Sequence, residues 1–238
     1  MTQKLTILFD LDGTLVNTAP DLMAAHNHVM KKFGYQQKNL DDIKQLAGKG
    51  AWIMMQRSFK KEIKDEKLKK EMVREFLNYY AKNIDKNSTP INGIISFLKW
   101  AQSKNIPMAV CTNKQERFAV DLLKKIKLEE YFHYIAGCDT FDFNKPDPRH
   151  LTNAIEIIGG DVNKAIMIGD SEVDSQSATN AKIPFILVED GYTEKRIDQI
   201  PHNIVVKNFL NFEFVFIKIS LYIRIMIVIS HKIFLIIT

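Results

Sequence analysis

The sequence is poor in cysteine, and the few cysteines are not arranged as metal ligands. Its 238 residues include only Cys111 and Cys138, which end or follow apolar runs in no zinc-ligand spacing. We therefore expect reduced structural thiols in a reducing compartment. A secretory signal is also missing, because the apolar run near the N-terminus is too short and ends in an acid. These absences predict a cytoplasmic protein without a zinc centre.

The chain also lacks a basic arm of the kind that binds nucleic acid, although its formal net charge is +5. In residues 59–76 lysine and glutamate alternate at helical spacing, which is typical of a solvated helix face. No nucleic-acid motif accompanies the charge, so we do not expect a nucleic acid as a partner.

A long uncharged apolar run is missing even from the most apolar part of the chain. Residues 209–238 are dense in isoleucine and phenylalanine, but Lys218, Arg224 and Lys232 interrupt them before about 18 uncharged residues accumulate. Three interpretations of this tail stay open: a translated frameshift or read-through, which we favour, an added strand or helix packed on the core, and a contact with a membrane surface or partner.

The sequence does contain a regular alternation of short apolar runs and helical stretches. The expected strands are residues 4–9, 106–112, 134–137, 164–169, 183–188 and 203–206. Helices of 10–15 residues separate most of them, which predicts an α/β fold with a doubly wound, mostly parallel, Rossmann-like sheet.

One long helical stretch interrupts that alternation directly after the first strand. Residues 17–88 are expected to form a helical cap over the carboxyl edge of the sheet, where open α/β sheets place their ligands. The expected core then consists of residues 1–16 and 89–208, and residues 209–238 are the apolar tail.

Four polar clusters each follow a predicted strand or strand loop, and such positions converge at one edge of a parallel sheet. They are Asp10-Leu-Asp12-Gly-Thr14, Thr112-Asn113, Lys145-Pro146 and Gly169-Asp170-Ser171-Glu-Val-Asp174. The carboxylates of Asp10, Asp170 and Asp174 are hard oxygen ligands, which suit Mg²⁺. Lys145 and Thr112, with nearby backbone N–H groups, can contact phosphate oxygens. The pattern predicts a site for a small phosphorylated metabolite.

The close pair Asp10 and Asp12 fits nucleophilic catalysis. A carboxylate can attack phosphorus to give an aspartyl-phosphate, and a second carboxyl group can protonate the leaving alcohol and then deprotonate the attacking water. We expect Asp10 to be the nucleophile and Asp12 the acid and base. Taken one at a time, an aspartate after a strand is often a helix N-cap, and Thr112 with Asn113 could merely cap the next helix.

The four clusters together resemble the signature of the haloacid dehalogenase-like phosphohydrolases over about residues 4–208, within them the phosphoglycolate phosphatase-like subgroup. The resemblance implies that Asp10, Asp12 (through its backbone carbonyl), Asp170 and Asp174 surround Mg²⁺. It implies that Thr112 and Lys145 orient the phosphoryl group, and that Asp174 supports Lys145 or a water on the metal. It also implies substrate contacts from Asn113 and from the glycine-rich cap loop Gly48-Lys49-Gly50.

The resemblance makes 2-phosphoglycolate the expected substrate, with glycolate and phosphate as products. A related capped phosphatase, a pyrophosphatase and a phosphomutase stay open, as does an inactive chain whose tail mediates association. A dehalogenase is disfavoured, because Asp12 has no use in carbon–halogen chemistry. Asn17 stands where the family commonly has an aspartate. The chain is expected to be a monomer or homodimer.

Overall fold

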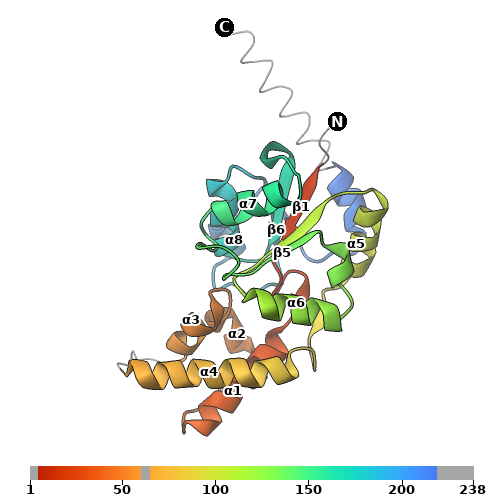
Figure 1. The fold of residues 1–238 in the computed structure, drawn as a ribbon. Coiled ribbons are helices and arrows are strands. Elements are labelled where there is room, and N and C mark those ends of the chain that lie inside the picture. Colours follow the sequence, from red (N-terminus) through yellow and green to blue (C-terminus); the bar gives the residue numbers. More distant parts are fainter. Residues whose placement is uncertain (1–4, 60–64, 219–238) are drawn as a thin grey trace, which may run out of the picture.

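The computed structural model describes residues 5–59 and 65–218 and places six strands in one parallel sheet, in the order β5-β4-β1-β6-β7-β8 (Figure 1). The strands are β1 Thr6–Phe9, β4 Met108–Cys111, β5 Tyr134–Ala136, β6 Ala165–Gly169, β7 Phe185–Val188 and β8 Ile204–Val206. All five pairings in the sheet are parallel. The predicted fold class is confirmed.

Helices cover both faces of this sheet and also form a separate group beyond its carboxyl edge. They are α1 Ala19–Lys32, α2 Ile43–Leu46, α3 Gly50–Arg57, α4 Glu66–Asn83, α5 Ile94–Ser103, α6 Glu116–Lys125, α7 Arg149–Ile157 and α8 Glu172–Asn180. Short 3₁₀ turns lie at Leu40–Asp42, Glu129–Tyr131, Val162–Lys164 and Ile197–Gln199. Among the described residues, no helix has the length and hydropathy needed to span a bilayer.

The alternation of side chains along the central strand explains the two covered faces. Ile7 and Phe9 of β1 belong to an apolar cluster that includes buried residues of α5 and α6. Leu8, between them, belongs to a second cluster that includes buried residues of α7 and α8. Because successive side chains of a strand point to opposite faces, a strand buried on both sides must be apolar throughout.

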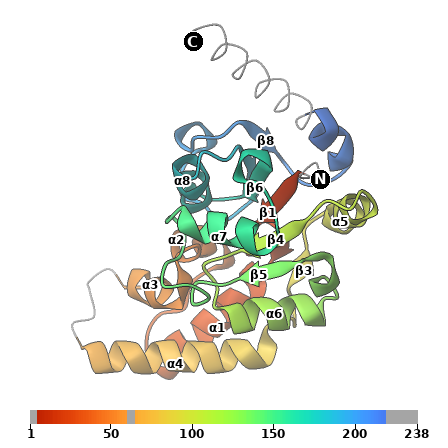
Figure 2. The same ribbon diagram turned by 45° about the horizontal axis from the view of Figure 1, so that its top comes forward.

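Helices α1 to α4, here called the helical insertion, lie together at one end of the molecule (Figures 1 and 2). The predicted helical stretch after residue 39 is divided into α2, α3 and α4. A two-stranded antiparallel pair that the sequence did not predict, β2 Val16–Asn17 and β3 Thr89–Pro90, forms where the chain leaves and re-enters the core. Each of its strands has only two residues, too short for a periodic signal.

The described part of the C-terminal segment packs on the core. Residues 212–218 are helical, and Phe209, Phe212 and Phe216 are buried. Their ring centroids lie 6.0, 4.7 and 5.3 Å from that of Phe97 in α5. The chain passes so close to Gly93 that a Cβ there would lie 2.3 Å from the Phe209 backbone.

This packing matches one of the three interpretations of the tail for residues 209–218. The rest of the expected tail, residues 219–238, lies outside the described residues.

Replacing Phe212 by alanine should lower the free energy of unfolding by about 3 kcal/mol, because it removes a buried ring and leaves a cavity. Urea denaturation measures the change. Phe214→Ala is the matched control: Phe214 is 64% exposed, so its loss should change stability little. Equal stability of the Phe212 variant and the wild type would show that the segment does not contribute to the core.

Candidate active site

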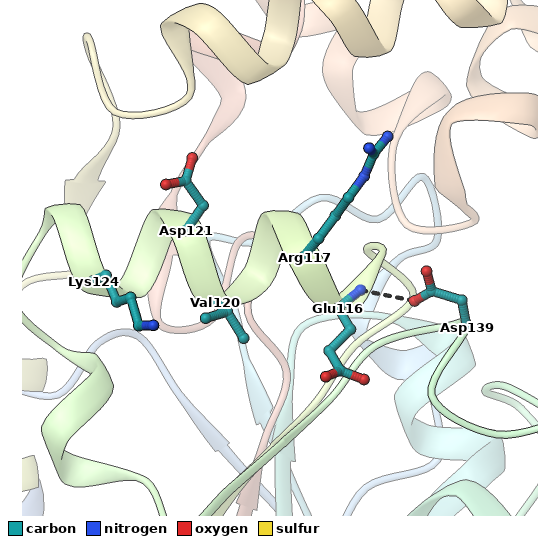
Figure 3. Close-up of a pocket in the computed structure, with 6 residues that line it drawn as sticks. All are labelled: Glu116, Arg117, Val120, Asp121, Lys124 and Asp139. Atoms are coloured by element: carbon teal, nitrogen blue, oxygen red, sulfur yellow. Dashed lines mark hydrogen bonds between the residues drawn. The ribbon is translucent and has the colours of Figure 1, made fainter.

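A broad surface hollow of about 560 Å³ lies over α6 and is lined by charged side chains of both signs. Figure 3 shows its residues, with the Glu116 backbone amide donating to Asp139 at 2.8 Å. That bond satisfies an orphan donor at the start of α6, so it has a structural explanation. None of the predicted site residues lines this hollow.

A second cavity of about 420 Å³ lies between the carboxyl edge of the sheet and the helical insertion. From the core it is lined by Asp10, Asp12, Thr112, Asn113 and Lys114, among others. From the insertion, the loop Gly48-Lys49-Gly50 and apolar side chains of α3 and α4 face it. Six of the predicted catalytic and substrate-binding residues therefore share this cavity with the predicted acid and base, Asp12.

Strand register explains why the polar clusters converge. Phe9 of β1 pairs with Val110 of β4 on one side and with Ile168 of β6 on the other. The residues that follow these strands, including Asp10, Thr112 and Asp170, must then lie at the same edge.

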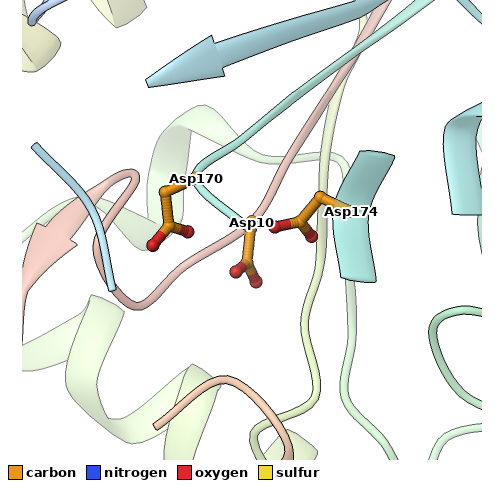
Figure 4. A group of neighbouring side chains, drawn as sticks. All are labelled: Asp10, Asp170 and Asp174. Atoms are coloured by element: carbon orange, nitrogen blue, oxygen red, sulfur yellow. The ribbon is translucent and has the colours of Figure 1, made fainter. Parts of the chain in front are cut away.

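Three carboxyl groups meet at this edge. Asp10, Asp170 and Asp174 each offer an oxygen, and these oxygens all lie within 4.8 Å of one another. Figure 4 shows the three side chains converging from the residue after β1, from the loop after β6 and from the first turn of α8. All three residues are at most 8% exposed.

Lys145 supplies a buried positive charge within this group. Its Nζ lies 2.9 Å from Asp10 Oδ1 and 2.5 Å from Asp174 Oδ1. The other oxygen of Asp174 accepts hydrogen bonds from the backbone and hydroxyl groups of Ser171, at 3.1 and 2.6 Å. Asp174 thus holds Lys145 and also completes the N-terminal capping box of α8.

Each carboxylate oxygen of Asp170 accepts a hydrogen bond, and these two bonds hold the side chain in place. Thr14 Oγ1 donates to Oδ1 at 3.0 Å, and the Tyr192 backbone N–H donates to Oδ2 at 2.5 Å. The loop that brings Tyr192 here has to pass very close, since a Cβ on Gly191 would lie 2.0 Å from Asp170 Cβ. Only glycine fits this position without moving the carboxylate.

The charges of the group do not balance. Burial raises the pKa of Asp10 to about 6, helped by Asp174 and opposed by Lys145. Burial and the nearby Asp10 also raise the pKa of Asp170 well above its usual range. Three buried carboxylates against one ammonium leave an excess of negative charge that a divalent cation would offset.

The side chain of Asp12 points to a different partner. Both of its oxygens lie 2.7 Å from Lys114 Nζ, and Thr18 Oγ1 donates to Oδ1 at 2.7 Å. The structure therefore does not place the Asp12 carboxylate in the three-carboxylate group. A role for its backbone carbonyl at a metal stays a prediction.

Thr112 and Asn113 form the loop between the carboxylates and the insertion. Thr112 is 2% exposed, and its hydroxyl accepts a hydrogen bond from the Lys114 backbone at 3.2 Å. Asn113 Nδ2 donates to the carbonyl of Lys145 at 3.0 Å and to that of Gly48 at 3.4 Å. Lys49, next to Gly48 in the loop of the insertion, points toward Glu172, with 3.7 Å between Lys49 Nζ and Glu172 Oε1.

Two residues that the sequence analysis did not single out lie in the cavity beside the predicted set. Lys114 follows Thr112 and Asn113 directly, so its position in the sequence could have identified it as a candidate site residue. Tyr80 belongs to α4 of the insertion, and nothing in the neighbouring sequence identifies it as a site residue.

Comparisons with known proteins give the relatives of this chain. Residues 7–188 match the family described as haloacid dehalogenase-like hydrolase. The chain is 40% identical over 206 residues to a phosphoglycolate phosphatase of Agrobacterium fabrum, covering 85% of this chain and 88% of that protein. It is 36% identical to a phosphoglycolate phosphatase of Caulobacter vibrioides, covering 87% of this chain and 88% of that protein.

Solved structures show the same fold. A predicted phosphoglycolate phosphatase from Haemophilus somnus superposes with a TM-score of 0.84 at 26% identity, covering 90% of this chain and 99% of that one. A β-phosphoglucomutase from Clostridium difficile superposes with a TM-score of 0.75 at 22% identity, covering 94% and 99%. The second likeness shows the fold alone.

Replacing Lys145 by methionine should destabilise the protein in a pH-dependent way when divalent cations are chelated. Without the ammonium, the pKa values of Asp10 and Asp170 should rise further above the values that they have in the unfolded chain. Folding is then penalised increasingly as pH rises above the unfolded pKa values. We expect a loss of about 3 kcal/mol at pH 8 and a smaller loss at pH 5, where these groups take up protons. Urea denaturation at the two pH values measures it.

Lys125→Met is the control for this experiment. Lys125 is partly exposed and pairs with Asp121 at 3.2 Å and Asp85 at 3.5 Å on the surface, so its loss should have a small effect at both pH values. A Lys145 variant that loses the same stability at pH 5 and pH 8 would contradict the charge imbalance.

Proposed function

Since the chain belongs to the haloacid dehalogenase-like hydrolases and is a phosphatase, we propose that it is a Mg²⁺-dependent phosphomonoesterase that hydrolyses 2-phosphoglycolate through an aspartyl-phosphate on Asp10. The observation that carries this proposal is the convergence of Asp10, Asp170, Asp174 and Lys145 at one edge of the sheet, where Asp10 also lines the cavity. The names of the relatives at 36–40% identity support the substrate.

The donor set fits Mg²⁺. It consists of carboxylate oxygens, which Mg²⁺ prefers, and it carries the excess negative charge that a divalent cation neutralises. Asp10 and Asp170 would hold the ion, with the backbone carbonyl of Asp12 as a further ligand. Asp174 is already bonded to Lys145 and Ser171, so its main task is to position Lys145. When bound, Mg²⁺ supplies a Lewis acid that polarises the phosphoryl oxygens.

In the first chemical step, a carboxylate oxygen of Asp10 attacks phosphorus, and the bond from phosphorus to the leaving oxygen breaks. Lys145, 2.9 Å from Asp10, and the hydroxyl of Thr112 would contact the phosphoryl oxygens. Asp12 gives its proton to the leaving alcohol. The products of this step are the alcohol and an aspartyl-phosphate.

In the second step, Asp12 removes a proton from water, which attacks phosphorus and releases inorganic phosphate from Asp10. Thr18 and Lys114 fix the orientation of the Asp12 carboxylate, at 2.7 Å each. The restored Asp12 carboxyl group is then ready for the next substrate.

A panel of small phosphomonoesters, each assayed with Mg²⁺ and with a chelator, tests this proposal. We expect the highest kcat/KM for 2-phosphoglycolate, at least about tenfold above sugar phosphates and pyrophosphate. Activity should disappear on chelation and return when Mg²⁺ is added. Preference for pyrophosphate, or isomerisation of a sugar phosphate without phosphate release, would assign the chain to another branch of the family.

The control is Asp10→Asn, which keeps the size of the side chain but removes the nucleophile. We expect no measurable turnover, with a circular dichroism spectrum equal to that of the wild type. Retained phosphate release by a pure, folded variant would rule out Asp10 as the nucleophile.

A further inference from the structure

Lys114 is a buried cation that the proposed mechanism uses only to orient Asp12. The residue is 9% exposed and lines the cavity between the core and the insertion. Its ammonium contacts both oxygens of Asp12 at 2.7 Å. An ammonium has three N–H donors. The two contacts to Asp12 leave one donor, and the Tyr80 hydroxyl lies within reach of it.

Tyr80 completes this end of the cavity from the opposite side. The residue belongs to α4 and is 2% exposed, and its hydroxyl meets no hydrogen-bond acceptor among the described residues, although the Lys114 ammonium lies beside it. Its ring centroid lies 4.8 Å from Lys114 Nζ. A buried hydroxyl without a partner costs free energy, which a ligand that accepts its hydrogen bond would recover.

The surroundings favour a small anion at this point. Apolar side chains of the insertion line the cavity beside Tyr80, among them Val73, Phe76 and Leu77. Charge-assisted hydrogen bonds are stronger in such low-dielectric surroundings than in water. Lys49, the other lysine of the cavity lining, is 40% exposed at its side chain and faces Glu172, so it is a poorer anchor for an anion.

The position of Lys114 next to Asp12 decides which part of a substrate can reach the ammonium. Asp12 has to contact the leaving oxygen in order to protonate it, and Lys114 is bonded directly to Asp12. A group one carbon away from the leaving oxygen therefore comes to lie beside Lys114. In 2-phosphoglycolate that group is the carboxylate.

We propose that Lys114 and Tyr80 form a subsite for the carboxylate of the leaving group, and that this subsite selects phosphomonoesters of small hydroxy acids. The proposal rests on the proposed function, in which Asp12 acts on the leaving oxygen. Lys114 is shared between Asp12 and the substrate, whereas the Tyr80 hydroxyl donates to the substrate alone.

The test compares the binding of two esters that differ only in this group. 2-Phosphoglycolate carries a carboxylate where 2-hydroxyethyl phosphate carries a neutral hydroxymethyl group. Calorimetric titration of the full-length Asp10→Asn variant with each ester, in Mg²⁺, gives a ratio of dissociation constants without turnover. We expect 2-phosphoglycolate to bind at least about tenfold more tightly, as one charge-assisted hydrogen bond allows.

Adding Lys114→Met should reduce this ratio to about one, and adding Tyr80→Phe should reduce it about threefold. Tyr80→Phe removes a single oxygen and keeps the ring, so it tests the subsite even if the lysine variant fails to fold. A ratio near one before any change at Lys114 would overturn the proposal, and so would a ratio that both substitutions leave intact.

Two further lysine variants locate the effect. Lys124→Met, in α6 and 59% exposed at its side chain, should leave the ratio unchanged. A ratio lost in Lys49→Met but kept in Lys114→Met would move the subsite to the glycine-rich loop and overturn the assignment.

Turnover separates this inference from the proposed function. If the chain with Asp10 intact releases phosphate from both esters at equal kcat/KM, the phosphatase assignment holds and the carboxylate subsite fails. If it releases phosphate from neither ester while the binding ratio depends on Lys114, the subsite holds and the proposed reaction fails.

Discussion

The contact of Lys145 with Asp10 and Asp174 is the interaction on which the rest of the site depends. Parallel strands force their polar ends together at one edge, and this edge holds three carboxylates that are almost completely buried. Such a group is costly unless positive charge compensates it, and one ammonium compensates only part. The same imbalance that costs folding free energy favours a divalent cation at this edge.

The helical insertion is tied to this edge at several points, so the site and the insertion form one structure. Tyr192 donates its backbone N–H to Asp170, and its hydroxyl bonds to Asn17 at 2.7 Å and to the Ala19 amide at 2.8 Å. Asn17 thus serves as a partner of Tyr192. On the other side, Asn113 joins the core loop to Gly48. Both parts therefore line the same cavity.

The fold and the three buried carboxylates could be predicted because their signals are local: apolar runs, helical spacing and acids directly after strands. Lys114 and Tyr80 were not identified as cavity residues. Their proximity depends on a contact between α4 and the loop after β4, which local sequence does not show. The contact of the Asp12 carboxylate with Lys114 could not be predicted either, because a spacing of two residues does not show which way a side chain points. Packing of Phe209 and Phe212 on α5 was one of three open interpretations, since composition does not distinguish a core helix from a foreign tail.

A crystal structure of the chain with Mg²⁺ and beryllium trifluoride, which mimics a phosphoryl group on a carboxylate, tests the central claim most directly. The account predicts beryllium bonded to an Asp10 oxygen, fluorines within hydrogen-bond distance of Lys145 and Thr112, and Mg²⁺ between Asp10 and Asp170. Beryllium bonded to Asp12, or Mg²⁺ bound away from the three-carboxylate group, would contradict it.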